Sequence, residues 1–257
     1  AIAERLGISE KDVCSFSVFK RSYDARKKAN ILLIYQLDVE LRSAQEHKLL
    51  EQFKNDSRVG PSPDTHYRFV AQAGPHFPQA EQQRPIIVGF GPCGILTALL
   101  LAQMGLKPIV LERGREVRQR TKDTWAMWRK RELNTESNVQ FGEGGAGTFS
   151  DGKLYSQVKD RRHLGRKVLS EFVKAGAPNE ILFVSKPHIG TFKLVTMVEK
   201  MRAEIIRLGG EVRFGVKVES LLREQDSDGA GQVTGLTTGS GETLLSRHIV
   251  LAIGHSA

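Results

Sequence analysis

The sequence predicts an α/β protein in which a small α+β domain precedes a parallel β-sheet with a β-hairpin crossover. Three observations support this fold class. A short apolar run at 86–88 leads through a glycine-rich turn into the apolar helical pattern of 95–104, and a second apolar run follows at 109–111. Later, 192–208 has helical spacing and 211–222 alternates like a strand. Because strand, helix and strand in this order form a βαβ unit, a parallel sheet is the expected core.

Three glycines lie in the turn between the first apolar run and the helix. Gly89, Gly91 and Gly94 form the pattern G-x-G-x-x-G. In a Rossmann-like fold the first permits a tight turn, the second lets the backbone approach a pyrophosphate, and the third allows the helix to pack closely on the sheet. Free N–H groups and the helix dipole then favour the phosphates. We therefore predict a dinucleotide site that also includes the intervening Pro92 and Cys93.

Glu112 stands at the end of the second apolar run. A carboxylate in this position can accept both hydroxyls of an adenosine ribose, and it repels a 2′-phosphate. The nucleotide is therefore expected to be unphosphorylated there. The competing interpretation is a glycine-rich turn that binds no ligand. The two strands, the helix and the acidic residue around the motif favour the dinucleotide site.

Composition excludes several other classes of protein. The chain has 257 residues, of which 40% are hydrophobic and 26% charged, as in ordinary globular proteins. Its two cysteines, Cys14 and Cys93, form no CxxC pattern, so a disulfide scaffold, a dithiol redox centre and a metal site are not predicted. No apolar run is long enough for a membrane span or a signal peptide. We expect no membrane partner and a reducing, cytoplasmic location.

Residues 1–70 are expected to form the small α+β domain, and residues 71–84, with glycine, prolines and several glutamines, a linker. Residues 85–257 then form the dinucleotide-binding domain. In the first domain, the predicted strands are 13–21, 31–41 and 66–70, and the predicted helix is 43–53. The chain begins without methionine and stops directly after an apolar strand, so we expect it to be a fragment.

A basic segment follows the second strand, on a chain with a net charge of +9. Residues 113–131 carry eight basic residues against two acidic ones, and Trp125 and Trp128 lie among them. The basic residues are Arg113, Arg115, Arg118, Arg120, Lys122, Arg129, Lys130 and Arg131. Basic residues interleaved with aromatic ones are typical of a nucleic-acid surface. A solvated helix face whose tryptophans pack inward is the more common explanation, so nucleic acid stays an alternative partner.

A glycine-rich run is the next candidate for ligand contact. Residues 142–147 contain four glycines, each of which would cost roughly 0.5–1 kcal/mol inside a helix or strand. The run therefore predicts a loop, either a flexible surface loop or one whose backbone passes very close to a ligand. Because a dinucleotide site is already predicted nearby, we favour ligand contact. The candidate residues are Gly144, Gly145, Ala146, Gly147 and Thr148.

The order of the last elements favours a flavin nucleotide over a nicotinamide nucleotide. Helix 192–208 is followed by strand 211–222, by a hairpin over 232–246, and by a buried strand at 248–253 that ends on Gly254. In a plain NAD domain, helical crossovers usually follow the third parallel strand. Here an antiparallel excursion returns to a strand whose terminal glycine can lie against the same nucleotide.

Several motifs carry a resemblance to a known family. They are V-G-F-G-P-C-G at 88–94, V-L-E-R-G at 110–114, N-V-Q-F-G-E-G-G-A-G-T-F-S-D-G-K-L at 138–154, K-P-H-I-G-T at 186–191 and L-A-I-G-H-S-A at 251–257. With these motifs the chain resembles the two-dinucleotide-binding-domain flavoproteins, and more narrowly the family of uncharacterised bacterial FAD-dependent dehydrogenases. The first two motifs are shared by many flavoproteins, whereas the others look specific to this family. Residues 19–29 also look like the small domain that precedes the flavin domain there.

The resemblance implies roles for individual residues. Gly89, Gly91 and Gly94 would hold the FAD pyrophosphate, and Glu112 the adenosine ribose. Arg113 would lie over or beside the adenosine. The remaining implied contacts are the backbone of Val218 with the adenine edge, Gly144 to Thr148 with the ribityl chain or flavin, and Gly254 with the pyrophosphate.

The resemblance also implies an FAD-dependent oxidoreductase with NAD(P)H as a candidate electron donor. Family members continue past Ala257 into a second domain that covers the flavin ring, so the substrate domain is expected to be missing here. The flavin supplies the redox chemistry, and the protein positions it.

No catalytic residue is predicted. Asp151, Lys153, His188 and His255 lie in family-like motifs and are expected to be hydrogen-bonding or capping residues. The nucleophile pattern G-x-S-x-G does not occur.

Three functions stay open. The first is an FAD-dependent oxidoreductase, or its FAD-binding portion, acting on a small-molecule substrate that the sequence does not identify. The second is an FAD-containing RNA-binding or RNA-modifying protein that uses residues 113–131. The third is a non-enzymatic nucleotide-binding fragment.

Overall fold

The computed structural model describes residues 1–79, 83–156, 158–225 and 231–254, except for the side chains of residues 43 and 44. The chain divides into two compact units. The hairpin unit contains Ala1–Tyr67, Leu154–Ser170 and Asn179–Pro187, and the sheet unit contains Arg68–Lys153, Glu171–Pro178 and His188–Ala257.

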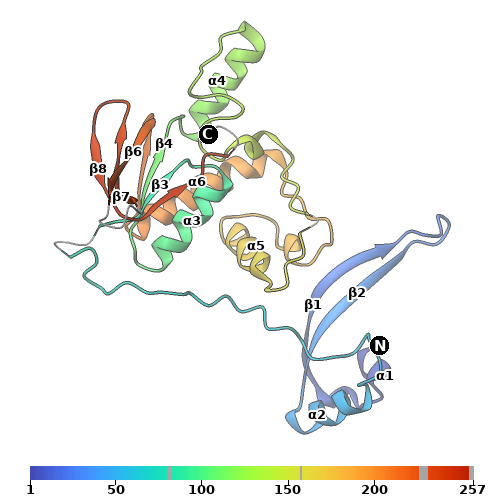
Figure 1. Ribbon diagram of the computed structural model, residues 1–257. Helices are drawn as coiled ribbons and strands as arrows, with labels where there is room; N and C mark the ends of the chain where they lie inside the picture. The colour runs from blue at the N-terminus through green and yellow to red at the C-terminus, as the bar shows by residue number, and fades with distance from the viewer. Residues whose placement is uncertain (80–82, 157, 226–230, 255–257) are drawn as a thin grey trace. The chain divides into compact units, whose positions relative to one another are not determined.

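A four-stranded parallel sheet forms the centre of the sheet unit (Figure 1). Its strands are β3 (Ile86–Val88), β4 (Ile109–Glu112), β5 (Glu211–Phe214) and β9 (Ile249–Leu251), in the order β5-β4-β3-β9. All neighbouring strands pair in parallel. Helix α3 (Pro92–Gln103) connects β3 to β4, which confirms the predicted βαβ unit and parallel sheet.

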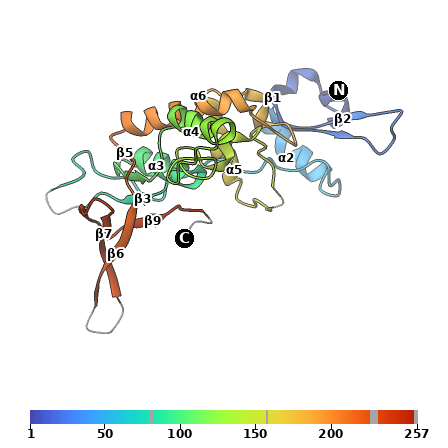
Figure 2. The same ribbon diagram turned by 90° about the horizontal axis from the view of Figure 1, so that it is seen from above.

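The sheet is covered on both faces. Alternate residues of a strand point to opposite faces, and Ile86, Val88 and Leu111 form one buried cluster with Leu236 of the neighbouring three-stranded sheet. That antiparallel sheet consists of β6 (Val218–Gln225), β7 (Gly231–Thr238) and β8 (Thr243–Leu245). Helices α3 and α6 (Thr191–Arg207) pack together in the same unit, and Figure 2 shows them on the side of the parallel sheet opposite β6 and β7.

The expected single strand over 211–222 is wrong. β5 ends at Phe214, and Gly215 takes a positive φ of +70°. The N–H groups of Gly215 and Val216 then donate to the carbonyls of Gly114 and Glu112 at 3.0 Å each. Because these bonds turn the chain at the end of β4, the second half of the run joins the antiparallel sheet as β6.

The hairpin unit contains an antiparallel pair, β1 (Val13–Asp24) and β2 (Leu32–Leu41), as the alternating pattern predicts. Its helices are α1 (Ile2–Leu6), the 3₁₀ turn η1 (Glu10–Asp12) and α2 (Ser43–Gln52). The predicted strand at 66–70 is wrong, because no described segment pairs with it.

Two later segments complete the hairpin unit. Arg166, on α5 (Leu164–Lys174), stacks over the ring of Phe19 at 4.0 Å and donates to its carbonyl at 2.7 Å. Residue 21 forms a parallel bridge with Val184, beyond the short turn η3 (Asn179–Leu182). A unit that begins at residue 1 therefore includes residues that follow the glycine-rich loop.

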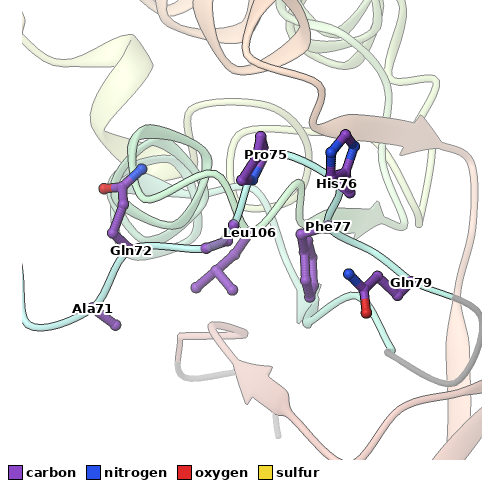
Figure 3. A pocket seen from close by; sticks show the side chains of 9 residues that line it. Ala71, Gln72, Pro75, His76, Phe77, Gln79 and Leu106 are labelled. Atoms are coloured by element: carbon purple, nitrogen blue, oxygen red, sulfur yellow. The ribbon is translucent and has the colours of Figure 1, made fainter.

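The stretch before β3 packs on the end of α3. The N–H of Ala73 donates to the carbonyl of Met104 at 2.8 Å, and Gly105 turns beneath it with a φ of +77°. A cavity of about 370 Å³ lies between residues 71–79 and Leu106, and Figure 3 shows Phe77 among the side chains around it. Among the described residues that line it there is no Asp, Glu, Lys or Arg, so we assign it no chemistry.

Candidate functional site

The turn between β3 and α3 needs two of its three glycines for the protein's own packing. Gly89 has a φ of +98°, and a Cβ there would lie 2.6 Å from the carbonyl oxygen of Ala252. A Cβ on Gly94 would lie 2.0 Å from the carbonyl oxygen of Gly89. Both distances are far below van der Waals contact, so a larger residue at either position would have to displace backbone.

Gly91 differs from its two neighbours. Its φ of −75° is accessible to any residue. A Cβ on Gly91 would come no closer than 3.8 Å to the nearest protein atom, the Cα of Gly145. The packing of the protein therefore does not require glycine here. A glycine at this position is explained if a ligand approaches the backbone where the Cβ would stand.

Helix α3 presents its amino terminus at the same place. The helix begins at Pro92, no side chain caps it from Gly91, and its first turn contains no acidic residue. The first N–H groups of a helix have no partner inside the helix, and the helix dipole adds partial positive charge. This end of α3 can thus bind an anionic group such as a phosphate.

A cavity of about 1270 Å³ opens beside the turn. It exceeds the roughly 300–1,000 Å³ of ordinary small-molecule pockets. Its walls come from the glycine turn, the end of β4, the loop at 138–146, residues 216–221 and the end of β9. The predicted site residues in its lining are Gly89, Gly91, Pro92, Cys93, Glu112, Arg113, Gly145, Ala146, Val218 and Gly254.

The other predicted site residues lie outside this lining. Gly94 packs α3 against the turn. Gly144 donates its N–H to the carbonyl of Phe90 at 2.9 Å, and a Cβ on it would lie 2.1 Å from Oγ1 of the buried Thr148. Gly147 has no atom within 4 Å of a built Cβ. Gly144 and Thr148 therefore shape the glycine-rich loop.

Glu112 is 4% exposed and ties the end of β4 to the glycine turn. Its Oε2 accepts a hydrogen bond from the N–H of Phe90 at 2.6 Å, and its Oε1 accepts one from the N–H of Gly114 at 2.8 Å. Both oxygens thus serve the protein's own backbone. Each still has a second lone pair, and the residue lines the cavity.

Arg113 supports the same wall. Its Nε donates to Glu136 at 2.6 Å, and its guanidinium stacks over the ring of Phe141 at 4.2 Å. Phe141, Asn138 and Leu133 are lining residues that the sequence argument assigned no role, although 138–141 belong to the quoted motif. Residues 138–141 could have been predicted as part of the site from the sequence, because they directly precede the glycine-rich run.

Two ionisable residues behind the loop are completely buried, Arg120 of α4 (Val117–Lys130) and Glu143. Burial lowers the pKa of Arg120 to about 10 and raises the pKa of Glu143 above its ordinary value. Oε2 of Glu143 accepts from the N–H of Val117 at 2.7 Å and lies 3.3 Å from a guanidinium nitrogen of Arg202. Its Oε1 has no hydrogen-bond partner among the described residues.

The basic segment 113–131 is divided between internal and exposed roles. Arg113, Arg115 and Arg118 form ion pairs with Glu136, Asp123 and Glu199 respectively, and Arg120 is buried. Arg129 stacks over the ring of Trp125 at 4.3 Å, so at least five of the eight basic residues interact within the described part of the chain. The expectation that the tryptophans pack inward is wrong: Trp125 and Trp128 are exposed, because they lie on the solvent side of α4, and contact each other edge to face.

The polar residues of the later motifs do not meet in the cavity. Asp151 and Lys153 form an exposed ion pair at 3.6 Å, and Lys153 forms an antiparallel bridge with His188. His255 lies outside the described residues. In the described part of the chain, no group of three or more His, Cys, Asp or Glu side chains could hold a metal ion. No described helix is long and apolar enough to cross a membrane.

A related bacterial sequence covers the whole chain. An uncharacterized protein of Clostridium beijerinckii is 40% identical over 256 residues, which is 100% of this chain and 45% of that protein. The chain thus spans about half the length of this curated relative. Residues 1–40 match the model of a domain of unknown function, DUF8436.

Solved structures overlap with part of the chain. THI4 of Thermovibrio ammonificans is 19% identical, with a TM-score of 0.44 over 68% of this chain and 58% of that one. A 3-ketosteroid-delta4-(5alpha)-dehydrogenase of Rhodococcus jostii RHA1 is 12% identical, with a TM-score of 0.41 over 70% and 48%. OTEMO in complex with FAD and NADP is 13% identical, with a TM-score of 0.39 over 66% and 25%.

Proposed function

We propose that the sheet unit binds FAD in the cavity beside the glycine turn, and that the chain is the FAD-binding portion of an FAD-dependent oxidoreductase. The observation that carries this proposal is Gly91. The protein's own packing does not require a glycine at this position. Gly91 also adjoins an uncapped helix amino terminus and lines a cavity of about 1270 Å³. A dinucleotide whose pyrophosphate lies against Gly91 explains all three features.

The lining residues suit the parts of FAD. The pyrophosphate would lie at Gly91 and the first N–H groups of α3, with Gly254 on its other side. The adenosine would lie between Glu112 and Val218. Gly145 and Ala146 of the glycine-rich loop would contact the ribityl chain or the flavin.

The antiparallel excursion favours FAD over a nicotinamide nucleotide at this site. Strands β6 to β8 leave the parallel sheet after β5, and the chain returns as β9, which ends beside the cavity. When bound, the flavin would supply hydride transfer, with NAD(P)H as the proposed electron donor. The protein contributes binding and orientation.

The proposed activity belongs to the sheet unit, since all residues that line the cavity lie in it. The division into a domain at 1–70, a linker at 71–84 and a binding domain at 85–257 stays a prediction. Since the chain covers 45% of its Clostridium relative, a small-molecule substrate and the residues that act on it are proposed for the longer protein.

The test measures the binding of FAD, NAD and ADP to the purified protein. Calorimetry gives the affinities, and the absorption spectrum from about 300 to 550 nm detects bound flavin. Gly91→Ala should fold normally, because its Cβ has room in the free protein. It should lose at least about tenfold in affinity for FAD and ADP, or roughly 1.4 kcal/mol. The matched control is Gly60→Ala, which lies in the other unit and where a Cβ meets nothing within 4 Å.

Three outcomes would overturn the proposal. Equal affinity of Gly91→Ala and wild type would remove the role of Gly91. Binding of NAD and ADP without FAD would indicate a plain nicotinamide domain. Binding of none of the three would mean that the turn holds no dinucleotide.

A further inference from the structure

The side chain of Arg120 lies wholly inside the sheet unit, with an exposure of 0%. It projects from the first turn of α4, in the same basic segment as Arg115 and Arg118, which form more exposed ion pairs. No carboxylate within hydrogen-bond distance neutralises it among the described residues. An unpaired guanidinium is costly to bury unless its N–H groups are satisfied, so the acceptors around it indicate what it does.

The four closest acceptors are backbone carbonyls of one loop, and Oγ1 of Thr148 accepts a longer hydrogen bond at 3.4 Å. Nε donates to Asn138 at 2.8 Å, and one terminal nitrogen donates to Val139 at 2.6 Å. The other terminal nitrogen donates to both Glu143 and Gly145, at 2.7 and 2.8 Å. A single planar fork thus joins both ends of the stretch 138–145, which has no helix or strand of its own.

The same stretch forms a wall of the candidate binding cavity. Asn138, Val139 and Gly145 line the cavity, and the carbonyl groups of the same three residues accept hydrogen bonds from Arg120. The close approach is visible at Gly142, where a Cβ would lie 2.5 Å from Cδ of Arg120. Gly142 therefore has to be glycine for the arginine to fit.

The loop in turn meets the glycine turn. Gly144 donates to the carbonyl of Phe90, and a Cβ on Gly145 would lie 3.3 Å from the Cα of Gly91. Within the stretch, Gly142 lies against the residue that follows the end of β4, since a Cβ built on Gly114 would lie 2.5 Å from the Cα of Gly142. The stretch held by Arg120 thus contacts both the end of β4 and the glycine turn.

We propose that Arg120 is the positioning residue of this site: its guanidinium holds residues 138–145 in the shape that forms one wall of the dinucleotide cavity. The proposal rests on the proposed function for the identity of the ligand. Arg120 itself is not among the residues that line the cavity. Its positive charge beside the cavity also favours an anionic ligand.

The experiment compares wild type with Arg120→Lys and with the matched control Arg118→Lys, an exposed arginine of the same helix that pairs with Glu199. Lysine keeps the charge but lacks the planar fork, so it cannot span both ends of the loop. Hydrogen exchange without ligand should be faster at amides 139–148 in Arg120→Lys, and unchanged in β3 and α3. The affinity for ADP should fall about tenfold or more, while Arg118→Lys matches wild type.

A second variant keeps the test decisive if lysine is not accommodated. Arg120→Ala removes the fork, and millimolar guanidinium ion should restore its ADP affinity at least in part, whereas Arg118→Ala should need no rescue. Unchanged exchange of 139–148 in Arg120→Lys would overturn the inference. So would wild-type ADP affinity in that variant, or an Arg120→Ala protein that folds and shows no rescue.

The inference and the proposed function can fail separately. If wild-type protein binds neither ADP nor FAD, the proposed function fails, and the exchange measurement alone decides whether Arg120 orders the loop. If wild type binds ADP and the Arg120 variants bind it equally well, the proposed function stands and the positioning role is removed.

Discussion

The parallel sheet and the β1–β2 hairpin are both built from apolar residues, yet they bury them differently. Ile86, Ile87 and Val88 of β3 are all buried, with β4 and β9 on either edge and a layer on each face. In β2, the consecutive residues Leu32 to Tyr35 are all exposed. The three residues of the central strand β3 are thus more completely buried than the ten residues of β2.

The difference shows that a strand pattern predicts pairing and that burial depends on the layers around the pair. Among the described residues, the β1–β2 ribbon has only the bridge of Arg21 with Val184 on its outer edges, and it needs further layers to hide its faces. A central parallel strand is enclosed by its neighbours and by the crossover helices. We therefore expect a single added carbon atom in the sheet unit to lower the free energy of unfolding. In the hairpin, the loss of a large side chain should change it little.

The largest effect is expected at Gly94. In Gly94→Ala the new Cβ would lie 2.0 Å from the carbonyl oxygen of Gly89, so α3 has to move away from the turn. We expect the free energy of unfolding to fall by at least about 3 kcal/mol, measured by urea denaturation. Gly60→Ala, with open space around its Cβ, is the matched control. Similar midpoints for the two variants would contradict the packing role of Gly94.

A smaller effect is expected at Glu143 and depends on pH. Burial raises its pKa, so the contribution of the protonated form to stability is fully present below its ordinary pKa of 4.5 and is lost as pH rises through the raised value. Glu143→Gln stays neutral throughout. Between pH 4.5 and 8, its free energy of unfolding relative to wild type should rise by about 1 kcal/mol or more, the size expected for an unsatisfied buried acceptor.

Glu204→Gln provides the control for this pH series. Hydrogen bonds from Arg207 lower the pKa of Glu204, so its carboxylate is ionised in both the folded and the unfolded state above its ordinary value. Its difference from wild type should therefore stay constant from about one pH unit above 4.5 up to pH 8. A constant difference for Glu143→Gln as well would show that Arg202 and the surrounding charges compensate the burial of Glu143.

The smallest effect is expected in the hairpin. Leu33 is 60% exposed and Leu99 of α3 is 2% exposed, so Leu33→Ala and Leu99→Ala remove the same atoms from opposite environments. We expect Leu33→Ala to change the free energy of unfolding by no more than about 0.5 kcal/mol. Leu99→Ala should cost about 2–5 kcal/mol. Equal costs in thermal or urea unfolding would mean that β2 is covered in solution.

The parts of the site that are close in sequence could be predicted. Gly89, Gly91, Gly94 and Glu112 belong to one βαβ unit, so a turn, a helix amino terminus and the next strand end meet through local geometry alone. Arg120 could not be found in this way. Within a basic segment it looks like any other surface arginine, and it is buried because residues 138–145 fold around it.

The sequence by itself determined the parallel sheet, the glycine turn and the antiparallel excursion, because periodicity and glycine spacing act over a few neighbouring residues. The tertiary structure alone decided that 211–222 divides at Gly215, that the tryptophans of α4 face outward, and that Glu112 binds backbone with both oxygens. It also placed later segments beside β1. The physical reason is the same in each case, since burial and hydrogen-bond partners come from segments far apart in the chain.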